Sequence, residues 1–350
     1  MIIYWIMMLL PAFFTLHPVR IEARFRKWAV WLVGIIFALI IGFRYEVGGD
    51  WERYFIVYRY LLESDSFFEV FIGRDIGFEF LYWLSFQLFS NIYFVNLICA
   101  IFFIAGLIRL CLSMPLPWLA LLVSVPFLIV VVSMGYTRQA AAVGLFMWGL
   151  VSLMRERKLS FYLFVIFASL FHYTVLIMLP IGLVYGSKKA NVIKVVFFSV
   201  IIAIFTYIIF YNLINHMFYY YILIKFHHSD GAVMRVFVNF LSAILFFIYR
   251  EEFKRKFHDE KLWFIFSLLS ILMFPAAFFY STLVDRVVIY LMPLQLVIAS
   301  RVVVLITSKY NRTLFVFMVI IMYSSILFTW LNFGNFSSYW LPYQNILINY

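Results

Sequence analysis

Long apolar stretches separated by short polar segments run along the whole of this 350-residue chain. The stretches long enough to cross a lipid bilayer as helices predict about ten crossings, at 1–16, 28–43, 92–111, 117–134, 139–154, 192–211, 234–250, 261–280, 286–307 and 313–331. We interpret the first as a retained span, because no small-residue cleavage site of a signal peptide follows it. The pattern predicts an all-α, polytopic membrane protein with one transmembrane domain over residues 1–350.

Two other apolar stretches do not fit a full crossing. The stretch 76–90 is short and carries Glu79 and Gln87, so we expect a re-entrant or interfacial helix. The stretch 159–185 begins and ends beside a basic cluster, so we expect it to enter the membrane and return as two half-helices. With these two hairpin-like elements, the remaining spans alternate in direction.

Most of the 27 Lys and Arg residues fall in clusters between alternate spans. The positive-inside rule places these clusters in the cytoplasm, and they comprise Arg20, Arg24, Arg26 and Lys27; Arg155, Arg157 and Lys158; Lys188, Lys189 and Lys194; Arg250, Lys254, Arg255, Lys256 and Lys261; and Arg301, Lys309 and Arg312. Arg109 joins them by alternation. Both termini and the loops 44–75 and 212–233 are then predicted on the opposite, extracytoplasmic side.

Composition supports a lipid environment and argues against a nucleic-acid partner. Hydrophobic residues make up 66% of the chain and charged residues 12%, which is more apolar surface than a soluble protein of this length can bury. The net charge of +11 comes from clusters between spans rather than from a continuous basic surface. Cys99 and Cys111 lie in or beside one apolar stretch and suggest neither a disulfide nor a metal site.

The positive residues predicted on the outer side are arginines apart from Lys225, namely Arg44, Arg53, Arg59, Arg74, Arg138, Arg235 and Arg286. A guanidinium group is a planar fork that binds phosphate or carboxylate through paired hydrogen bonds, which favours an anionic ligand on this face. For Arg53, Arg59 and Arg74 we prefer a simpler interpretation, in which they pair with acidic residues of the 44–75 loop.

A glycine-rich turn follows the second span within residues 42–54. Gly48 and Gly49 permit a tight turn, after which Asp50 is placed to cap a short helix. A cap needs no further function. However, Arg44 and Asp50 bracket the turn at membrane depth, where ionisable groups are expensive, and this favours a functional site.

Three arginines are predicted at the outer, N-terminal ends of helices: Arg138, Arg235 and Arg286. A helix N-terminus presents free N–H groups and partial positive charge, so an added arginine favours binding of a diphosphate. The small residues from Gln139 to Gly144 should let a neighbouring helix approach closely. The roles open to Asp285 are ion-pair partner of Arg286, helix cap or catalytic group.

His172 lies at the expected joint of the 159–185 hairpin. A lone histidine in an apolar stretch is usually a packed residue, whereas non-helical backbone inside a membrane normally lines a cavity, and both interpretations stay open. His227 and His228 resemble a metal cluster only superficially, since no third ligand is evident. We expect neither a metal nor another cofactor.

The segment 42–54 resembles the G-x-R-x-x-x-G-x-D-x-x-x-Y signature of the EpsG/Wzy-type polysaccharide polymerases, with Gly49 in place of the usual Thr. Four other segments are similar to that family and follow in its order along nearly the whole chain: Arg138-Gln139, Phe171-His172, Asp285-Arg286 with Tyr290, and Tyr339-Trp340-Leu341-Pro342-Tyr343.

The resemblance implies a GT-C-like glycosyltransferase of the bacterial inner membrane. Members of the family join oligosaccharide repeat units carried on undecaprenyl diphosphate at the periplasmic face, without nucleotide sugars and generally without metal. The implied partners are a lipid-linked oligosaccharide donor and acceptor, membrane lipid and a chain-length regulator protein.

On this hypothesis Arg138 and Arg286 stabilise the leaving diphosphate. Asp50 or His172 orients or deprotonates the acceptor hydroxyl. The remaining residues of the predicted site bind substrate, and they are Arg44, Tyr45, Tyr54, Gln139, Arg235, Asp285 and Tyr290.

Three other functions stay open. A ligase that passes the glycan to lipid A core would use similar arginines. A flippase for lipid-linked oligosaccharides should show repeated halves and charges along a path between leaflets, whereas the unusual charges here gather on one face. A membrane O-acyltransferase would need a histidine in its own signature and an acyl donor on the cytoplasmic side.

Overall fold

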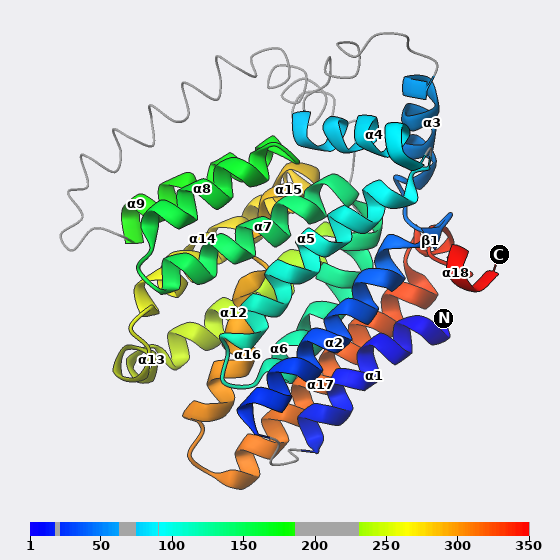
Figure 1. The fold of residues 1–350 in the computed structure, drawn as a ribbon. Coiled ribbons are helices and arrows are strands. Elements are labelled where there is room, and N and C mark those ends of the chain that lie inside the picture. Colours follow the sequence, from blue (N-terminus) through cyan, green and yellow to red (C-terminus); the bar gives the residue numbers. More distant parts are fainter. Residues whose placement is uncertain (18–21, 63–74, 90, 186–230, 350) are drawn as a thin grey trace.

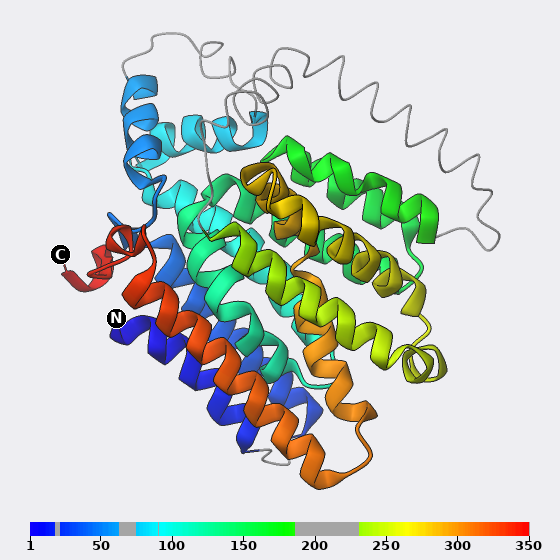
Figure 2. The same ribbon diagram turned by 180° about the vertical axis from the view of Figure 1, so that it is seen from behind.

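The computed structural model describes residues 1–17, 22–62, 75–89, 91–185 and 231–349. These residues form a helical bundle with two short strands (Figure 1 and, from behind, Figure 2). The elements before residue 155 are α1 (Ile2–Leu16), α2 (Ala23–Gly42), β1 (Arg44–Tyr45), α3 (Trp51–Leu62), α4 (Ile76–Phe89), α5 (Tyr93–Leu112), α6 (Pro117–Ser124), the π-helix η2 (Val125–Ser133) and α7 (Thr137–Met154). Those after it are α8 (Lys158–Ser169), the 3-10 helix η3 (Tyr173–Met178), α9 (Leu179–Tyr185), α12 (Ala232–Ile248), α13 (Arg250–Lys256), α14 (Glu260–Ala277), α15 (Ser281–Leu291), α16 (Pro293–Leu305), α17 (Lys309–Phe333), η5 (Ser337–Tyr339), β2 (Gln344–Asn345) and α18 (Ile346–Asn349).

Helices occupy every predicted span that lies within the described residues. Among these residues, four helices are long and apolar enough to cross a membrane, or up to six if the bent pairs α12–α13 and α15–α16 each count as one span. The predicted span 192–211, most of the predicted loop 212–233 and the histidine pair in it lie outside the described residues. The chain is therefore an all-α, multi-pass membrane protein, and the count of about ten crossings stays a prediction.

The stretch 159–185 forms the hairpin that its flanking basic clusters predict. α8 is separated from η3 and α9 by a break at residues 170–172. The chain returns alongside α8, because a Cβ on Gly182 would lie 2.9 Å from ring atoms of both Phe161 and Tyr162. The short helix α4 docks on the break, where the Gly77 amide donates to the Leu170 carbonyl over 2.8 Å.

A close crossing of α5 and α7 forms the centre of the bundle. A Cβ on Gly106 would lie 1.8 Å from the Gly144 carbonyl oxygen, and a Cβ on Gly144 would lie 2.3 Å from Phe103 Cα. Only glycine permits backbones to approach this closely. The prediction that small residues near the start of α7 admit a neighbouring helix is confirmed, and the crossing fixes the position of Arg138.

The C-terminal segment folds back onto the glycine turn. β2 pairs antiparallel with β1, and the Gly48 amide donates to the Tyr339 carbonyl over 2.8 Å. The Trp340 side chain is buried, and its indole N–H donates to the Val130 carbonyl over 2.8 Å. The C-terminal segment is therefore part of the folded structure.

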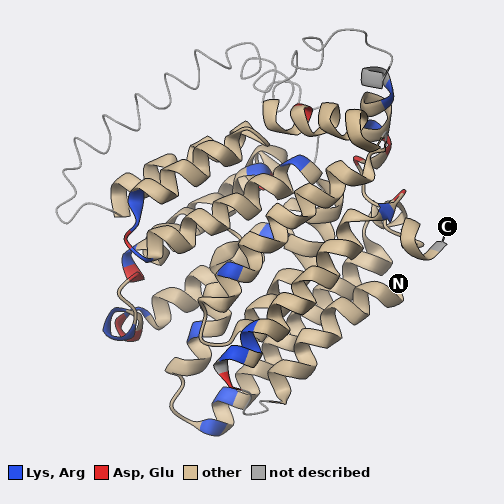
Figure 3. Ribbon diagram, in the orientation of Figure 1, with Lys and Arg blue, Asp and Glu red and all other residues tan. Residues whose placement is uncertain are grey.

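Both termini lie at the end of the bundle that carries this turn (Figure 1). The two ends of the chain are joined there by a hydrogen bond of 2.7 Å from the Tyr4 hydroxyl to the Trp340 carbonyl. Lys and Arg are concentrated toward the opposite end (Figure 3). This arrangement agrees with the predicted alternation of spans, whereas the assignment of the two ends to periplasm and cytoplasm stays a prediction.

The two glycines of the turn should respond differently to substitution. Gly48 has a φ of 111°, and a Cβ there would lie 2.0 Å from the Met134 carbonyl oxygen. A Cβ on Gly49 would meet only Trp340 among the described residues, at 3.9 Å, so there is room for the Cβ of the Thr in the usual signature. We expect Gly48→Ala to lower the thermal midpoint of the detergent-solubilised protein sharply, because backbone strain alone costs roughly 1–3 kcal/mol. Gly49→Ala is the matched control, and equal midpoints for the two variants would contradict this account.

Candidate active site

A partly buried ion pair between Arg138 and Asp75 lies where three elements meet. Arg138 is the second residue of α7, and Asp75 immediately precedes α4. Arg138 Nη1 donates to Asp75 Oδ2 over 2.8 Å. His172, at the break between α8 and η3, places its Nδ1 3.8 Å from the same oxygen. The docking of α4 on the hairpin therefore brings a cation, a carboxylate and an imidazole together.

Several polar atoms of this group have no hydrogen-bond partner among the described residues. They are both ring nitrogens of His172 and Oδ1 of Asp75. The two residues are 8% and 2% exposed. Buried polar atoms almost always find partners, because a missing hydrogen bond costs about 1–3 kcal/mol. Exceptions of this kind concentrate where a ligand or a proton transfer uses the open positions.

Aromatic rings flank the Arg138 guanidinium. Its Cζ lies 5.6 Å from the ring centroid of Tyr54 and 5.9 Å from that of Phe78. The side chain is still 34% exposed, whereas its partner Asp75 is buried. A guanidinium has five N–H donors, so a group held by one carboxylate and two ring faces keeps donors for an anion.

Asp50 precedes α3 and is linked to the same group through Tyr54. The Tyr54 hydroxyl donates to Asp50 Oδ2 over 3.4 Å, and in the described part of the chain no amide of α3 donates to this carboxylate. Burial raises the pKa of the Asp50 carboxyl, and the positive charges of Arg138, Arg53 and Arg286 oppose the rise. The described contacts therefore include no side-chain cap of α3 by Asp50, and a functional role of Asp50 stays a prediction.

The Arg44 side chain makes hydrogen bonds within the glycine turn. It is 1% exposed, and its guanidinium donates to the Ile41 carbonyl over 2.6 Å and to the Val47 carbonyl over 3.1 Å. A third bond of 2.7 Å goes to the Thr137 hydroxyl at the start of α7. Arg44 therefore positions the turn against the helix that carries Arg138.

A second buried ion pair joins α12 to α15. Arg235 Nε donates to Asp285 Oδ1 and Nη2 donates to Oδ2, both over 2.7 Å. The sequence suggests Arg286 as a partner of Asp285, but the structure pairs Asp285 with Arg235. A phosphate bound by Arg235 would have to share this guanidinium with Asp285, so the pair serves mainly to hold the two helices together.

Arg286 lies in the second turn of α15, because that helix begins at Ser281 and not at the arginine. The prediction of a helix N-terminus at Arg286 is therefore wrong. Arg138 and Arg235 do lie in the first turns of their helices, as predicted. Gln139 Nε2 donates to the Arg286 carbonyl over 3.2 Å and so joins the start of α7 to α15.

The two remaining predicted tyrosines lie in different surroundings. Tyr290 is fully buried, and its hydroxyl lies 2.9 Å from that of Thr174 at the start of η3. This contact joins α15 to the hairpin close to His172. Tyr45 lies in β1 at the glycine turn, with its ring centroid 6.3 Å from that of Trp51.

An open cavity of about 800 Å³ lies beside the glycine turn and along α3. Both aromatic and charged side chains line it, among them Trp51, Phe55, Tyr339, Glu46, Glu52 and Arg53. Aromatic faces with a few polar groups at their edges are suited to a sugar ring, which has an apolar face and peripheral hydroxyls. The cavity is therefore a candidate for the binding of a glycan.

Comparison with known proteins places the chain in a family. The model of the EpsG family matches residues 27–345, a range that contains every residue of the candidate site. The chain belongs to the EpsG family. No curated protein and no solved structure shows a significant match to it. Family membership indicates a membrane enzyme of the polysaccharide-polymerase type.

Two residues of the candidate site in this EpsG-family chain, Asp75 and Thr174, were not predicted from the sequence. An aspartate directly before an apolar helix has the pattern of an ordinary N-cap, so nothing local distinguishes Asp75. Its partners lie 63 and 97 positions further along the chain, at Arg138 and His172. An arginine on a central helix of an apolar bundle implies a carboxylate partner elsewhere in the chain. A search for that partner among the acidic residues could have led to Asp75.

We expect Asp75→Asn to reduce polysaccharide synthesis in cells by about a hundredfold, because it removes the charge that orients both Arg138 and His172. The measurement is polymer amount and length on a gel, normalised to the amount of protein in the membrane. Glu251→Gln is the matched control, since Glu251 pairs with Lys254 on the surface. Polymer of ordinary length and amount from Asp75→Asn would show that the pair has no part in the reaction.

Proposed function

We propose that this EpsG-family protein polymerises oligosaccharide repeat units carried on undecaprenyl diphosphate into an O-antigen or exopolysaccharide. A hydroxyl of the incoming lipid-linked repeat attacks the anomeric carbon of the growing glycan. The bond from that carbon to the diphosphate oxygen breaks, and the hydroxyl proton passes to a base. Undecaprenyl diphosphate leaves as the second product.

The group formed by Arg138, Asp75 and His172 carries this proposal. It combines a partly exposed guanidinium with a buried carboxylate and imidazole that have open hydrogen-bond positions. Transfer from a lipid diphosphate needs a cation for the leaving group and an acceptor for a proton. Both kinds of group are present within one ion-pair network.

Arg138 and Arg286 are the proposed ligands of the diphosphate. Gln139, the neighbour of Arg138, donates to the Arg286 carbonyl over 3.2 Å, and the charges of both arginines oppose the rise in the pKa of Asp50. Negative charge builds on the diphosphate oxygen as the glycosidic bond breaks, and a guanidinium fork stabilises it through charge-assisted hydrogen bonds. Arg44 supports the site by holding the glycine turn in place, and Arg235 supports it by joining α12 to α15.

The acceptor glycan is proposed to lie in the cavity along α3. His172, 3.8 Å from Asp75, or Asp50, next to Tyr54, would accept the proton of the acceptor hydroxyl. Both are supported by geometry, because the ring nitrogens of His172 are open among the described residues and Asp50 receives a long hydrogen bond of 3.4 Å from Tyr54.

The proposed location is the bacterial inner membrane, with the site and both termini at the periplasmic face. The concentration of Lys and Arg at the other end of the bundle supports this orientation (Figure 3). About ten crossings and a GT-C-like arrangement belong to the same proposal. The donor and acceptor lipids would enter from the bilayer, and a chain-length regulator is the proposed protein partner.

The direct test uses the purified full-length protein in lipid vesicles with the native repeat unit on undecaprenyl diphosphate. We expect a ladder of longer glycans and release of undecaprenyl diphosphate. Transfer of the glycan to lipid A core without a ladder would indicate a ligase. Movement of the lipid across the bilayer without any new glycosidic bond would indicate a flippase, and either result would overturn the proposal.

In the same assay, Arg138→Lys should not restore polymerisation, because lysine keeps the charge but lacks the planar fork. Loss of one such charge-assisted contact in the transition state costs on the order of a hundredfold or more in rate. Arg59→Lys is the control, since Arg59 is exposed and packs on Phe55 with its Cζ 6.0 Å from the ring centroid. A full ladder from Arg138→Lys would mean that charge alone is sufficient.

Asp50→Asn separates a base from a structural carboxylate. Asparagine keeps the shape of Asp50 and its contact with Tyr54, so we expect ordinary membrane expression but only single-repeat glycan, a loss of about a hundredfold to ten-thousandfold in rate. Because burial raises the pKa of Asp50, the wild-type rate should fall with decreasing pH at a pKa above the ordinary value of about 3.9. A complete ladder from Asp50→Asn would assign the proton to His172.

A further inference from the structure

A second cavity, of about 460 Å³, lies at the end of the bundle opposite the glycine turn. It is formed by the start of α2, the end of α5, the start of α6 and the end of α7. Four cationic side chains line it, namely Arg26, Lys27, Arg109 and Arg155, together with Trp31 and Trp148. The described residues that line it include no carboxylate.

Arg109 is the least exposed of the four cations of this basic cavity. Its guanidinium Cζ lies 4.7 Å from the ring centroid of Trp148. Its Nε atom is buried and has no hydrogen-bond partner among the described residues. Arg155 lines the same cavity, so both positive charges border one space. Bringing these cations together costs free energy unless an anion lies between them.

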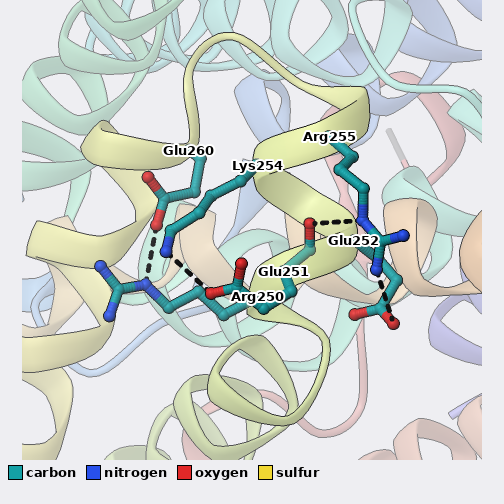
Figure 4. Close-up of polar contacts among 6 residues, drawn as sticks. All are labelled: Arg250, Glu251, Glu252, Lys254, Arg255 and Glu260. Carbon is teal, nitrogen blue, oxygen red and sulfur yellow. Dashed lines mark hydrogen bonds and ion pairs between the residues drawn. The ribbon is translucent and has the colours of Figure 1, made fainter.

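The neighbouring helix α13 shows how basic residues at this end are otherwise neutralised (Figure 4). Lys254 lies 2.8 Å from Glu251, and Arg250 lies 2.9 Å from Glu260. Across the described part of the chain, none of the four cations of the basic cavity takes part in an ion pair of this kind. Ion pairs among the described residues therefore do not explain why these cations gather here.

We propose that the basic cavity binds the phosphate group of an anionic membrane lipid. Clustered Lys and Arg between helix ends, with tryptophan beside them, are suited to a lipid headgroup at a membrane surface. The helix α2, which lines the cavity with Arg26, Lys27 and Trp31, also exposes Trp28, Leu32 and Ile35, at 64%, 60% and 53%. Acyl chains can lie along these side chains, which favours a lipid over free phosphate as the source of the anion.

The site is independent of the proposed polymerase reaction, because it lies at the other end of the bundle. A lipid bound there would join α2, α5 and α7 by bridging cations that otherwise repel one another. It would thereby stabilise the end of α7 opposite to Arg138. The expected readouts are therefore lipid binding and thermal stability, and neither depends on catalysis.

The test titrates the purified full-length protein in neutral detergent with dioleoyl phosphatidylglycerol, dioleoyl phosphatidylcholine or inorganic phosphate. Native mass spectrometry counts bound lipid, and the thermal midpoint reports stabilisation. We expect phosphatidylglycerol to bind and to stabilise, and phosphatidylcholine to have little effect. Lys27→Gln combined with Arg155→Gln should weaken phosphatidylglycerol binding about thirtyfold, since each basic residue near a lipid surface contributes roughly a factor of five.

The matched control is Lys254→Gln combined with Arg255→Gln, which removes the same charge from exposed positions on α13. Lys27 and Arg155 are also exposed, so neither pair should disturb folding. Arg109→Gln provides a second variant at the buried side of the cavity. Equal stabilisation by inorganic phosphate would confirm the phosphate site but overturn the lipid as its source. Equal lipid binding by the cavity pair and the control pair would overturn the proposal itself.

Discussion

The cost of burying charge in an apolar bundle determines how these helices are held together. A charge that leaves water is tolerated only where a counter-charge or hydrogen bonds replace its hydration. Arg301 meets this condition through two bonds of 2.7 Å to Asp259, and Arg235 through two of 2.7 Å to Asp285. Arg44 meets it with two backbone carbonyls and a hydroxyl. Each contact joins separate segments of the chain, so satisfying the charges also sets how the helices fit together.

The pair of Arg138 and Asp75 meets the same requirement only in part. A single bond joins the two side chains, whereas the pairs at Arg235 and Arg301 are doubly bonded. One oxygen of Asp75 and both nitrogens of His172 remain open among the described residues. Nε of Arg301 also lacks a partner among the described residues, so open positions alone do not mark a binding site. The candidate active site differs from the other pairs because it combines a partly exposed guanidinium with open positions on both a carboxylate and an imidazole.

The helices and the hairpin could be predicted because their causes are local. Apolar length predicts a helix, basic clusters on both sides of 159–185 predict a return, and glycine at 144 predicts a close crossing. The pairing of β1 with β2 could not be predicted in this way, since it joins residues 44 and 345 through the backbone. Asp75 was missed for a similar reason, because its role depends on partners brought to it by the docking of α4. The start of α15 was predicted too late in the chain. The helix begins at Ser281, and its first turns include polar residues that hydropathy assigns to a loop.

Asp75 couples the two halves of the proposed reaction. Its Oδ2 atom is shared, 2.8 Å from Arg138 and 3.8 Å from His172. A diphosphate bound by Arg138 competes for that guanidinium and leaves more of the carboxylate's negative charge to act on the imidazole. Proton uptake by His172 is then favoured when the donor is bound, which is when the acceptor hydroxyl has to lose its proton. An arrangement in which one carboxylate serves both groups therefore links activation of the acceptor to the presence of the donor.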